Sequence, residues 1–260
     1  MRSTLFVFVL AGLFACRDFH PQNPDQARTN EPSDSDDIGD IGDTDIDTHN
    51  TESPCNQVHL GDYYIEDSAD VDALVGVCEI TASLYVSSSD VTDLRGLESL
   101  TTIREVLAVS GTALTSLDGL SNLESAKIIY FSSNPMLTQV DDLDGLTSVT
   151  EALTFVGNSS LVDLEGLTTL TEVGEYISIS MNHALTSVDG LRTIAQIDQR
   201  LFIEDNDALE DLDGLENLTR VAGDLTIQGN DSLCQSEVDR YVSTVSIGGH
   251  TTDTPNDPGC

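Results

Sequence analysis

A four-residue phrase, Asn-x-x-Leu, recurs five times in the second half of the chain at a constant step of 24 residues. The copies begin at Asn134, Asn158, Asn182, Asn206 and Asn230. A Leu-x-Gly-Leu phrase, with Val in place of the first Leu at position 188, occurs six times, with its glycine at positions 96, 119, 145, 166, 190 and 214. Repeats of constant length indicate structural units that stack on one another in phase.

Within each repeat, short apolar segments predict strands. Leu225-Thr-Ile227 alternates with a period of two, and no segment of the repeats keeps a helical period for ten residues. Gly214 and Gly229 stand where the chain is expected to turn. Trp is absent and aromatic residues make up 5% of the chain, so the core must be aliphatic. We expect a mainly β fold, a parallel β-helix or leucine-rich-repeat-like solenoid of six to seven coils, with strands of two to five residues.

The Asn column has a physical explanation in such a stack. An Asn at an inward-facing corner can donate to and accept from the backbone of its own and the adjacent coil. Five residues in phase therefore predict a hydrogen-bond ladder through the stack. The alternative is a set of solvent-facing turn residues, and in both cases the column is structural.

The two ends of the stack are expected to carry caps. Residues 55–83 form the N-terminal cap and lead into a first strand at Leu84-Tyr-Val86, and residues 234–260 form the C-terminal cap. The latter begins with a short helix, capped by Ser236, whose apolar side chains face the last coil; these are Val238, Tyr241, Val242 and Val245. Four cysteines, two in each cap, allow three pairings, and two of these would join opposite ends of the stack. We therefore expect Cys55–Cys78 and Cys234–Cys260; zinc is disfavoured because the spacings provide no adjacent ligand pairs.

The first residues resemble an export signal. One Arg precedes an apolar run from Leu5 to Phe14 that is too short for a permanent membrane span. The run ends in Leu13-Phe14-Ala15-Cys16, which resembles the bacterial lipobox, and this implies a signal peptide over residues 1–15 and a lipidated Cys16. The alternative is an ordinary cleaved signal with an unrelated cysteine. Residues 16–54 are rich in Asp and poor in apolar residues, so we expect a disordered acidic tether before the solenoid of residues 55–260.

Charge excludes some partners. Ten Lys and Arg against 46 Asp and Glu give a formal charge of −36, which repels nucleic acid. The segment Asp43–Asp47 lacks the Gly and Glu of a calcium-binding EF-hand loop. Repeated acids such as Asp142/Asp144, Asp163/Glu165 and Asp211/Asp213 are expected to form solvated ladders along one edge. Stacked carboxylates repel, so some could have a raised pKa or collect Ca²⁺ weakly; no cofactor or dedicated metal site is expected.

No catalytic constellation is evident. The five histidines are His20, His49, His59, His183 and His250, and none belongs to a ligand or nucleophile motif. The basic residues that a polysaccharide lyase would need are scattered. Outward strand positions instead align as a candidate binding face of hydroxyl and aromatic side chains, Tyr130, Thr154, Ser178, Phe202 and Thr226. Beside them lie Ser132, Val156, Ser180, Glu204 and Gln228. An ordinary solvated sheet face is the alternative.

The chain also resembles a known module, the receptor L domain of growth-factor and insulin receptors. Cys55, Cys78-Glu-Ile80, Leu84-Tyr-Val86 and Asn230-Asp-Ser-Leu233-Cys234 match its pattern, and the resemblance covers residues 55–260. It implies a right-handed parallel β-helix with disulfide-closed ends. The receptors' ligands do not carry over, because a second L domain, a Cys-rich region and Trp are missing. We expect a non-enzymatic protein lipid-anchored at a bacterial outer membrane or cell surface, where it binds a protein or glycan. The alternative is a secreted carbohydrate-active β-helix enzyme.

Overall fold

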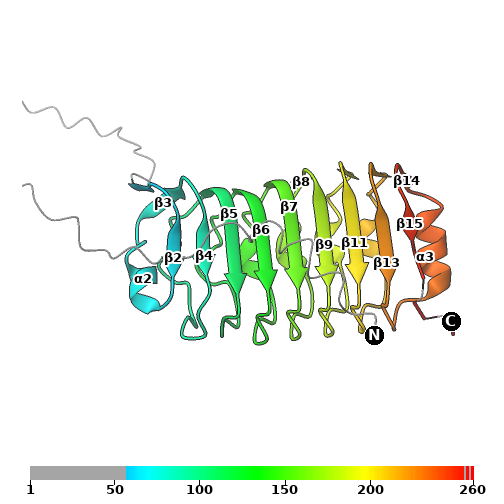
Figure 1. Cartoon of the computed structure of the whole chain (residues 1–260), viewed down its shortest axis with the longest axis horizontal. Coiled ribbons are helices and arrows are strands. Elements are labelled where there is room, and N and C mark those ends of the chain that lie inside the picture. Colours follow the sequence, from blue (N-terminus) through cyan, green and yellow to red (C-terminus); the bar gives the residue numbers. More distant parts are fainter. Residues whose placement is uncertain (1–56, 255, 258) are drawn as a thin grey trace, which may run out of the picture. The chain divides into compact units, whose positions relative to one another are not determined.

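The protein is mainly β and is built on a long parallel sheet (Figure 1). The computed structural model describes residues 57–254, 256–257 and 259–260. Nine strands follow one another as hydrogen-bonded parallel neighbours in the order β1-β3-β5-β6-β7-β9-β11-β13-β15. Strands β2, β4 and β8 complete this sheet, and β10, β12 and β14 form a second, three-stranded parallel sheet. The regular consecutive pairing is consistent with a solenoid-like repeat.

The strands have the following bounds: β1 Gln57–His59, β2 Tyr63–Ile65, β3 Val77–Ile80, β4 Leu84–Val86, β5 Thr102–Ser110, β6 Ser125–Ser132, β7 Ser148–Val156, β8 Glu172–Val173, β9 Tyr176–Ser180, β10 Gln196–Ile197, β11 Arg200–Glu204, β12 Arg220–Val221, β13 Leu225–Gln228, β14 Ser246–Ile247 and β15 Thr251–Thr252. Leu84–Val86 is a strand, as expected, but not the first, because the N-terminal cap itself supplies β1, β2 and β3. Strands β5, β6 and β7 are also longer than expected, since each continues through a register shift before the main face.

The register reproduces the sequence period. Leu201 on β11 pairs with Ile177 on β9 and with Leu225 on β13, so equivalent residues 24 positions apart lie side by side. Because side chains alternate along a strand, every in-phase residue points to the same side of the sheet. The aliphatic residues of each repeat thus form one continuous core.

The core is aliphatic apart from Tyr241 in the C-terminal cap and from Phe131 and Phe155, whose rings stack with centroids 5.3 Å apart. Helix α2 (Ser68–Asp72) lies in the N-terminal cap and buries Val71. Helix α3 (Gln235–Val242) covers the C-terminal end with Val238 and Tyr241. The expected Ser236 cap is wrong, because α3 starts two residues earlier, with Cys234 at its N-cap and no side-chain cap bond.

The C-terminal cap is closed by a disulfide. Cys234 and Cys260 are bonded as predicted, and their Cα atoms lie 5.7 Å apart. Cys55 lies outside the described residues, so the expected Cys55–Cys78 pairing stays a prediction. The expected lipidation site Cys16, the tether and the Asp43–Asp47 segment also lie outside them.

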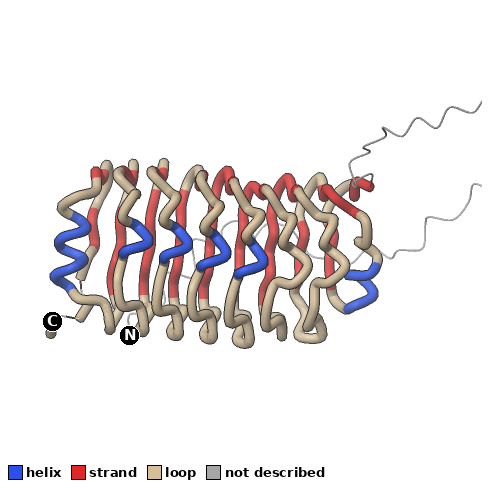
Figure 2. Tube along the Cα trace, turned by 180° about the vertical axis from the view of Figure 1, so that it is seen from behind, coloured by secondary structure: helices blue, strands red, loops and turns tan. Residues whose placement is uncertain are grey.

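Within the described part of the chain, four short 3₁₀ helices occupy the side opposite the long sheet, where the sequence predicts no helix (Figure 2). They are η1 Asp141–Leu143, η2 Glu165–Leu167, η3 Asp189–Leu191 and η4 Asp213–Leu215, and consecutive ones contact each other. The last three coincide with the Leu-x-Gly-Leu phrase. Each is only three residues long, so it leaves no helical period in the sequence.

The glycine of this phrase allows neighbouring repeats to approach closely, and at Gly96 and Gly119 it also has a positive φ. The chain turns at Gly214, as expected, within η4, and the φ of Gly214 is not positive. A Cβ at Gly190 would lie 1.7 Å from the Leu164 carbonyl oxygen, and one at Gly214 would lie 2.0 Å from that of Val188. A side chain here would therefore force neighbouring repeats apart.

The Asn column forms the predicted ladder. Asn134, Asn158, Asn182, Asn206 and Asn230 are all fully buried. In each, the backbone N–H and side-chain Nδ2 donate to the Oδ1 of the next Asn, and Nδ2 also donates to a backbone carbonyl of the preceding repeat. Every polar atom of these buried amides is satisfied, which is the condition for burying them.

Both ends of the ladder have terminating groups that the period does not indicate. At the front, the hydroxyl of Thr112 donates to Asn134 Oδ1 at 2.8 Å. At the back, a sixth rung, Asn256, accepts from Asn230 at 26 residues' separation and donates to Gln235 Oε1 at 3.2 Å. The C-terminal cap therefore closes the hydrogen-bond ladder as well as the core.

Candidate binding face

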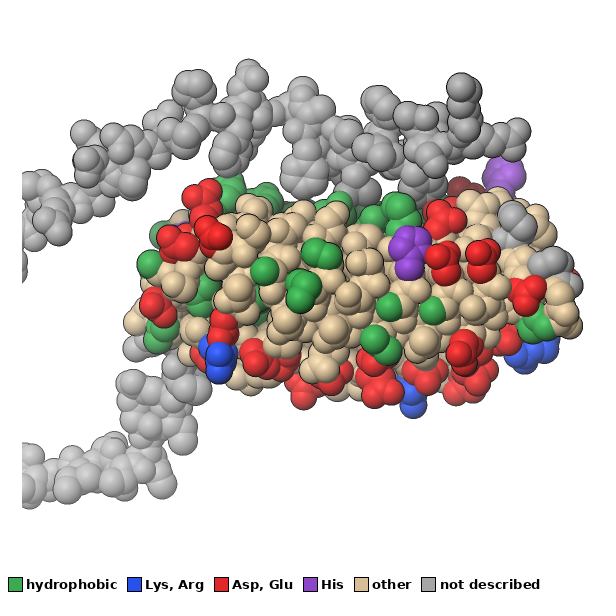
Figure 3. All heavy atoms as spheres, turned by 90° about the horizontal axis from the view of Figure 1, so that it is seen from below, with side chains coloured by type: hydrophobic (Ala, Val, Ile, Leu, Met, Phe, Trp, Pro, Cys, Tyr) green, Lys and Arg blue, Asp and Glu red, His purple; other side chains and the backbone are tan. Residues whose placement is uncertain are grey.

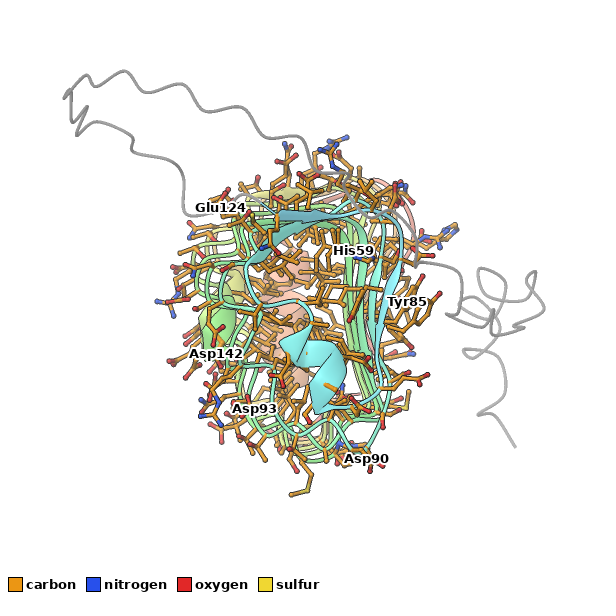
Figure 4. The ribbon with its side chains drawn as sticks, turned by 90° about the vertical axis from the view of Figure 1, so that its left-hand side faces the viewer. His59, Tyr85, Asp90, Asp93, Glu124 and Asp142 are labelled. Carbon is orange, nitrogen blue, oxygen red and sulfur yellow. A yellow bond between two sulfur atoms is a disulfide. The ribbon has the colours of Figure 1, made fainter. Side chains whose placement is uncertain are left out.

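The five candidate residues lie in register on the outer side of the long sheet. Tyr130, Thr154, Ser178, Phe202 and Thr226 pair in that order across β6, β7, β9, β11 and β13. Their neighbours along each strand belong to the core, so the alternation directs these side chains away from it. Viewed along the stack, Tyr85, of the same row, points outward from the sheet, and Asp142 lies on the opposite side (Figure 4).

Three in-register rows make up this surface, which we call the outer face. The first contains Val106, Ile128, Ala152 and Tyr176; the second Tyr85, Ala108, Tyr130, Thr154 and Ser178; and the third Ser110, Ser132, Val156 and Ser180. None of these thirteen residues is charged. The next strand, β11, carries the charged residues Arg200 and Glu204 in the first and third rows. Eight of the thirteen are partly exposed, so the chain keeps part of its surface free of charge despite its formal charge of −36.

Aromatic side chains concentrate on the same side. Of the nine Tyr and Phe residues at described positions, two lie in the core (Phe131, Phe155), two in the caps (Tyr63, Tyr241) and five on the outer side of the sheet (Tyr64, Tyr85, Tyr130, Tyr176, Phe202). Tyr64 and Tyr85 stack with ring centroids 5.0 Å apart. Sequence reasoning missed Tyr64, Tyr85 and Tyr176, because the first two precede the Asn-x-x-Leu copies and the third lies in the neighbouring row.

Small polar residues separate two of the aromatic positions. Thr154 and Ser178 stand between Tyr130 and Phe202, and Ser180 is next to Ser178 on its strand. We call Thr154, Ser178 and Ser180 the hydroxyl strip. They are 1%, 8% and 4% exposed, and the Ser180 Oγ has no hydrogen-bond partner.

Polar and titratable groups border the hydroxyl strip. The Nε2 of Gln228 donates to Glu204 Oε1 at 2.7 Å, and burial raises the pKa of Glu204. Burial also raises the pKa of Tyr176, beside Thr154. At the starts of the strands, Lys127 Nζ bridges Glu105 and Glu151 at 3.0 and 3.3 Å. The strip is therefore an uncharged stretch with a hydrogen-bonding edge.

The repeated acids lie on other sides of the molecule, and some have local structural roles. Asp163 Oδ1 and Asp211 Oδ1 each accept the backbone N–H two residues later at 3.1 Å. Asp142 Oδ2 accepts from Leu117 N at 3.2 Å, and burial, together with the charge of Asp118, raises the pKa of Asp142. Figure 3 shows Asp and Glu side chains along one long edge.

The described histidines lie apart from one another. His183 Nδ1 contacts Asp207 at 2.9 Å, and His250 Nδ1 lies 3.6 Å from Asp224, while His59 is in the N-terminal cap. Within the described part of the chain, no group of three or more His, Cys, Asp or Glu residues could hold a metal ion. His20 and His49 lie outside it.

A separate polar pocket of about 580 Å³ lies beside α2. It is lined by Glu66, Asp67, Ser87, Ser88, Ser89 and Asp90.

Comparisons of the chain with protein-family models, with characterised proteins and with solved structures find no match. Among the described residues, no helix has both the length and the apolar character needed to cross a membrane.

Proposed function

We propose that the protein is a non-enzymatic surface module that binds a protein or glycan through the outer face of its long sheet. The proposal rests on one observation. A chain with 46 acidic residues places thirteen uncharged residues together across five strands, and five of its nine described aromatic side chains lie on that side. Aromatic, weakly polar surfaces are typical of recognition sites, because their burial is favourable without the desolvation of charges.

The finer architecture and setting belong to the same proposal. In-phase pairing over nine strands, a buried Asn ladder and the Cys234–Cys260 clamp support a right-handed L-domain-like solenoid with closed ends. We further propose that Cys16 is lipidated and that residues 16–54 hold the solenoid away from a bacterial outer membrane. Each buried methylene of a lipid adds about 0.8 kcal/mol, so several acyl chains give a stable anchor.

A secreted carbohydrate-active enzyme is the second candidate, favoured by the abundance of carboxylates. Glycoside hydrolysis needs a pair of carboxyl groups facing one substrate position. Asp142, whose pKa is raised in part by the Asp118 carboxylate, lies on the side opposite the outer face (Figure 4). We therefore place binding ahead of catalysis.

Two variants of the full chain test the binding face. Tyr130→Arg introduces a charge on the outer face, and Asp144→Arg introduces the same side chain on the opposite, acidic side. The proposal expects Tyr130→Arg to abolish capture of surface proteins or glycans and Asp144→Arg to retain it. Equal capture by both variants would reject the outer face.

Two further experiments test the anchor and the enzyme alternative. Retained membrane association after Cys16→Ala would reject the anchor, and glycan cleavage that depends on Asp118 and Asp142 would favour the enzyme.

A further inference from the structure

We propose that the hydroxyl strip between Tyr130 and Phe202 binds a neutral, extended oligosaccharide. This inference rests on the proposed function and specifies its ligand. It combines three observations: the order of side chains along one row, a buried hydroxyl without a partner, and the absence of charge.

The order of side chains suits a chain of sugar rings. Tyr130, Thr154, Ser178 and Phe202 occupy successive strands. With strands about 4.8 Å apart, the two aromatic positions are roughly 14 Å apart, which is long enough for several linked sugar units. A pyranose ring has apolar C–H faces and a rim of hydroxyl groups. The faces can pack on Tyr130 and Phe202 while the rim lies over Thr154 and Ser178.

The Ser180 hydroxyl indicates a missing polar partner. It is 4% exposed and makes no hydrogen bond, although nearly all buried polar groups in proteins are paired. It belongs to the row that continues to Glu204, which already accepts a hydrogen bond from Gln228 at 2.7 Å. A carboxylate oxygen, an amide and a serine hydroxyl together can both accept from and donate to sugar hydroxyls.

Charge limits the class of glycan. The thirteen residues of the outer face include no Lys or Arg, and the neighbouring Arg200 lies 3.6 Å from Asp224. A uronic-acid or sulfated glycan would meet no cation on this face and would be repelled by the formal charge of −36. A basic protein partner would be attracted to the acidic edge (Figure 3) rather than to the uncharged strip. A neutral glycan fits best.

Calorimetric titration of the full chain tests the ligand class. The probes are cellohexaose, laminarihexaose, mannohexaose and chitohexaose, with hexagalacturonate as the anionic control. We expect at least one neutral hexasaccharide to bind and hexagalacturonate not to bind. A panel in which no neutral sugar binds, or in which hexagalacturonate binds as tightly as they do, overturns the assignment.

Matched variants test whether the sugar binds at the hydroxyl strip. Tyr130→Ala is expected to weaken binding at least tenfold and Ser180→Ala about fivefold, as for one lost hydrogen bond. Met136→Ala and Ser160→Ala truncate side chains outside the outer face and should leave affinity within twofold. Ser180→Ala should also leave the free protein as stable as before or more so, because it removes an unpaired hydroxyl. Weaker binding with undiminished stability distinguishes a ligand contact from a folding defect.

Failure of this inference and of the proposed function are distinguishable. If neutral sugars do not bind but Tyr130→Arg abolishes capture of a surface protein, the glycan assignment is overturned and the binding face stands. If sugars bind and none of the outer-face variants changes their affinity, both are overturned.

Discussion

The backbone N–H and the side-chain Nδ2 of Asn182 both donate to one atom, the Oδ1 of Asn206, at 3.1 and 3.3 Å. Asn182 also donates to the Phe155 carbonyl at 3.0 Å and accepts from Asn158. One buried amide thus joins three successive repeats. Its hydrogen bonds specify the phase of stacking, whereas the aliphatic core provides attraction without direction.

Asn182→Ala should therefore be strongly destabilising. The substitution leaves the Asn158 backbone N–H without an acceptor, leaves Asn158 Nδ2 with the Phe131 carbonyl alone, and removes the amide donor to the Phe155 carbonyl. Each buried group left unpaired costs about 1–3 kcal/mol. We expect the free energy of unfolding to fall by about 3 kcal/mol or more in urea denaturation. Asn217→Ala, which removes a single exposed bond to Arg192, is the control and should cost less than about 1 kcal/mol. Equal effects would mean that the ladder has no special role.

Gly190→Ala should be worse tolerated than Gly157→Ala, although Gly157 has a positive φ of 69° and Gly190 does not. A Cβ at Gly190 would overlap the Leu164 carbonyl oxygen, whereas one at Gly157 would come no closer than 3.8 Å to the Ser133 hydroxyl. We expect a loss of about 3 kcal/mol or more at Gly190 and about 1 kcal/mol at Gly157. Thermal unfolding of both variants checks the order, and the reverse order would contradict the close-approach explanation.

Replacing Met181 by Gly should stabilise the protein. The residue before each ladder Asn from Asn134 to Asn230 adopts a left-handed conformation, and at Ser133, Met181 and Asp205 it is not glycine. Relief of this strain outweighs the extra freedom of the unfolded chain, so we expect a gain of about 0.5 kcal/mol at Met181. Met136→Gly removes another exposed methionine at a position without positive φ and should destabilise. A loss of stability in both variants, measured by denaturant titration, would contradict the argument.

Removal of the C-terminal disulfide should lower the stability of the C-terminal cap. Cys234 and Cys260 close a loop with a sequence separation of 26. A loop of this length corresponds to about 3.5 kcal/mol of chain entropy. In a repeat stack each unit contacts its neighbours, so the loss should be local. Hydrogen exchange of the Cys234→Ala/Cys260→Ala variant is expected to accelerate over residues 246–257 and to stay unchanged in β9. Uniform acceleration along the stack would instead indicate a single cooperative unit.

Asp142→Asn should stabilise the protein in a pH-dependent way. Burial and the Asp118 carboxylate raise the pKa of Asp142 above its usual value of 3.8. The folded state therefore binds this proton more tightly than the unfolded state, and stability falls as pH rises through the interval just above 3.8. Asn keeps an acceptor for Leu117 without the charge, so we expect a gain of a few tenths of a kcal/mol at pH 7 that vanishes by about pH 3.

Chemical denaturation at the two pH values measures the effect. Asp118→Asn removes only the repulsion and leaves Asp142 charged and partly buried, so it should give a smaller gain, because burial is the larger cause of the raised pKa of Asp142. A gain that is equally large at both pH values would show that charge is not its cause.

Much of the architecture follows from residue spacing alone. The constant step of 24 implies in-phase stacking, and that phase then places Asn182 beside Asn206 and Thr154 beside Ser178 without further information. The Cys234–Cys260 pair follows from the same geometry, since the other pairings would cross the stack. These features are predictable because a repeat converts one-dimensional periodicity into three-dimensional adjacency.

Other features depend on contacts that no period encodes. Asn256 joins the ladder at a separation of 26 because the C-terminal cap brings it under Asn230, and Gln235 ends the ladder from α3. The requirement for Gly190 comes from a carbonyl oxygen 26 residues earlier, and Tyr85 and Tyr176 join the outer face through pairings outside the Asn-x-x-Leu copies. Sequence periodicity thus determined which residues align, whereas the tertiary structure decided what closes the ends and how near the backbones approach, because those depend on distances between atoms far apart in the chain.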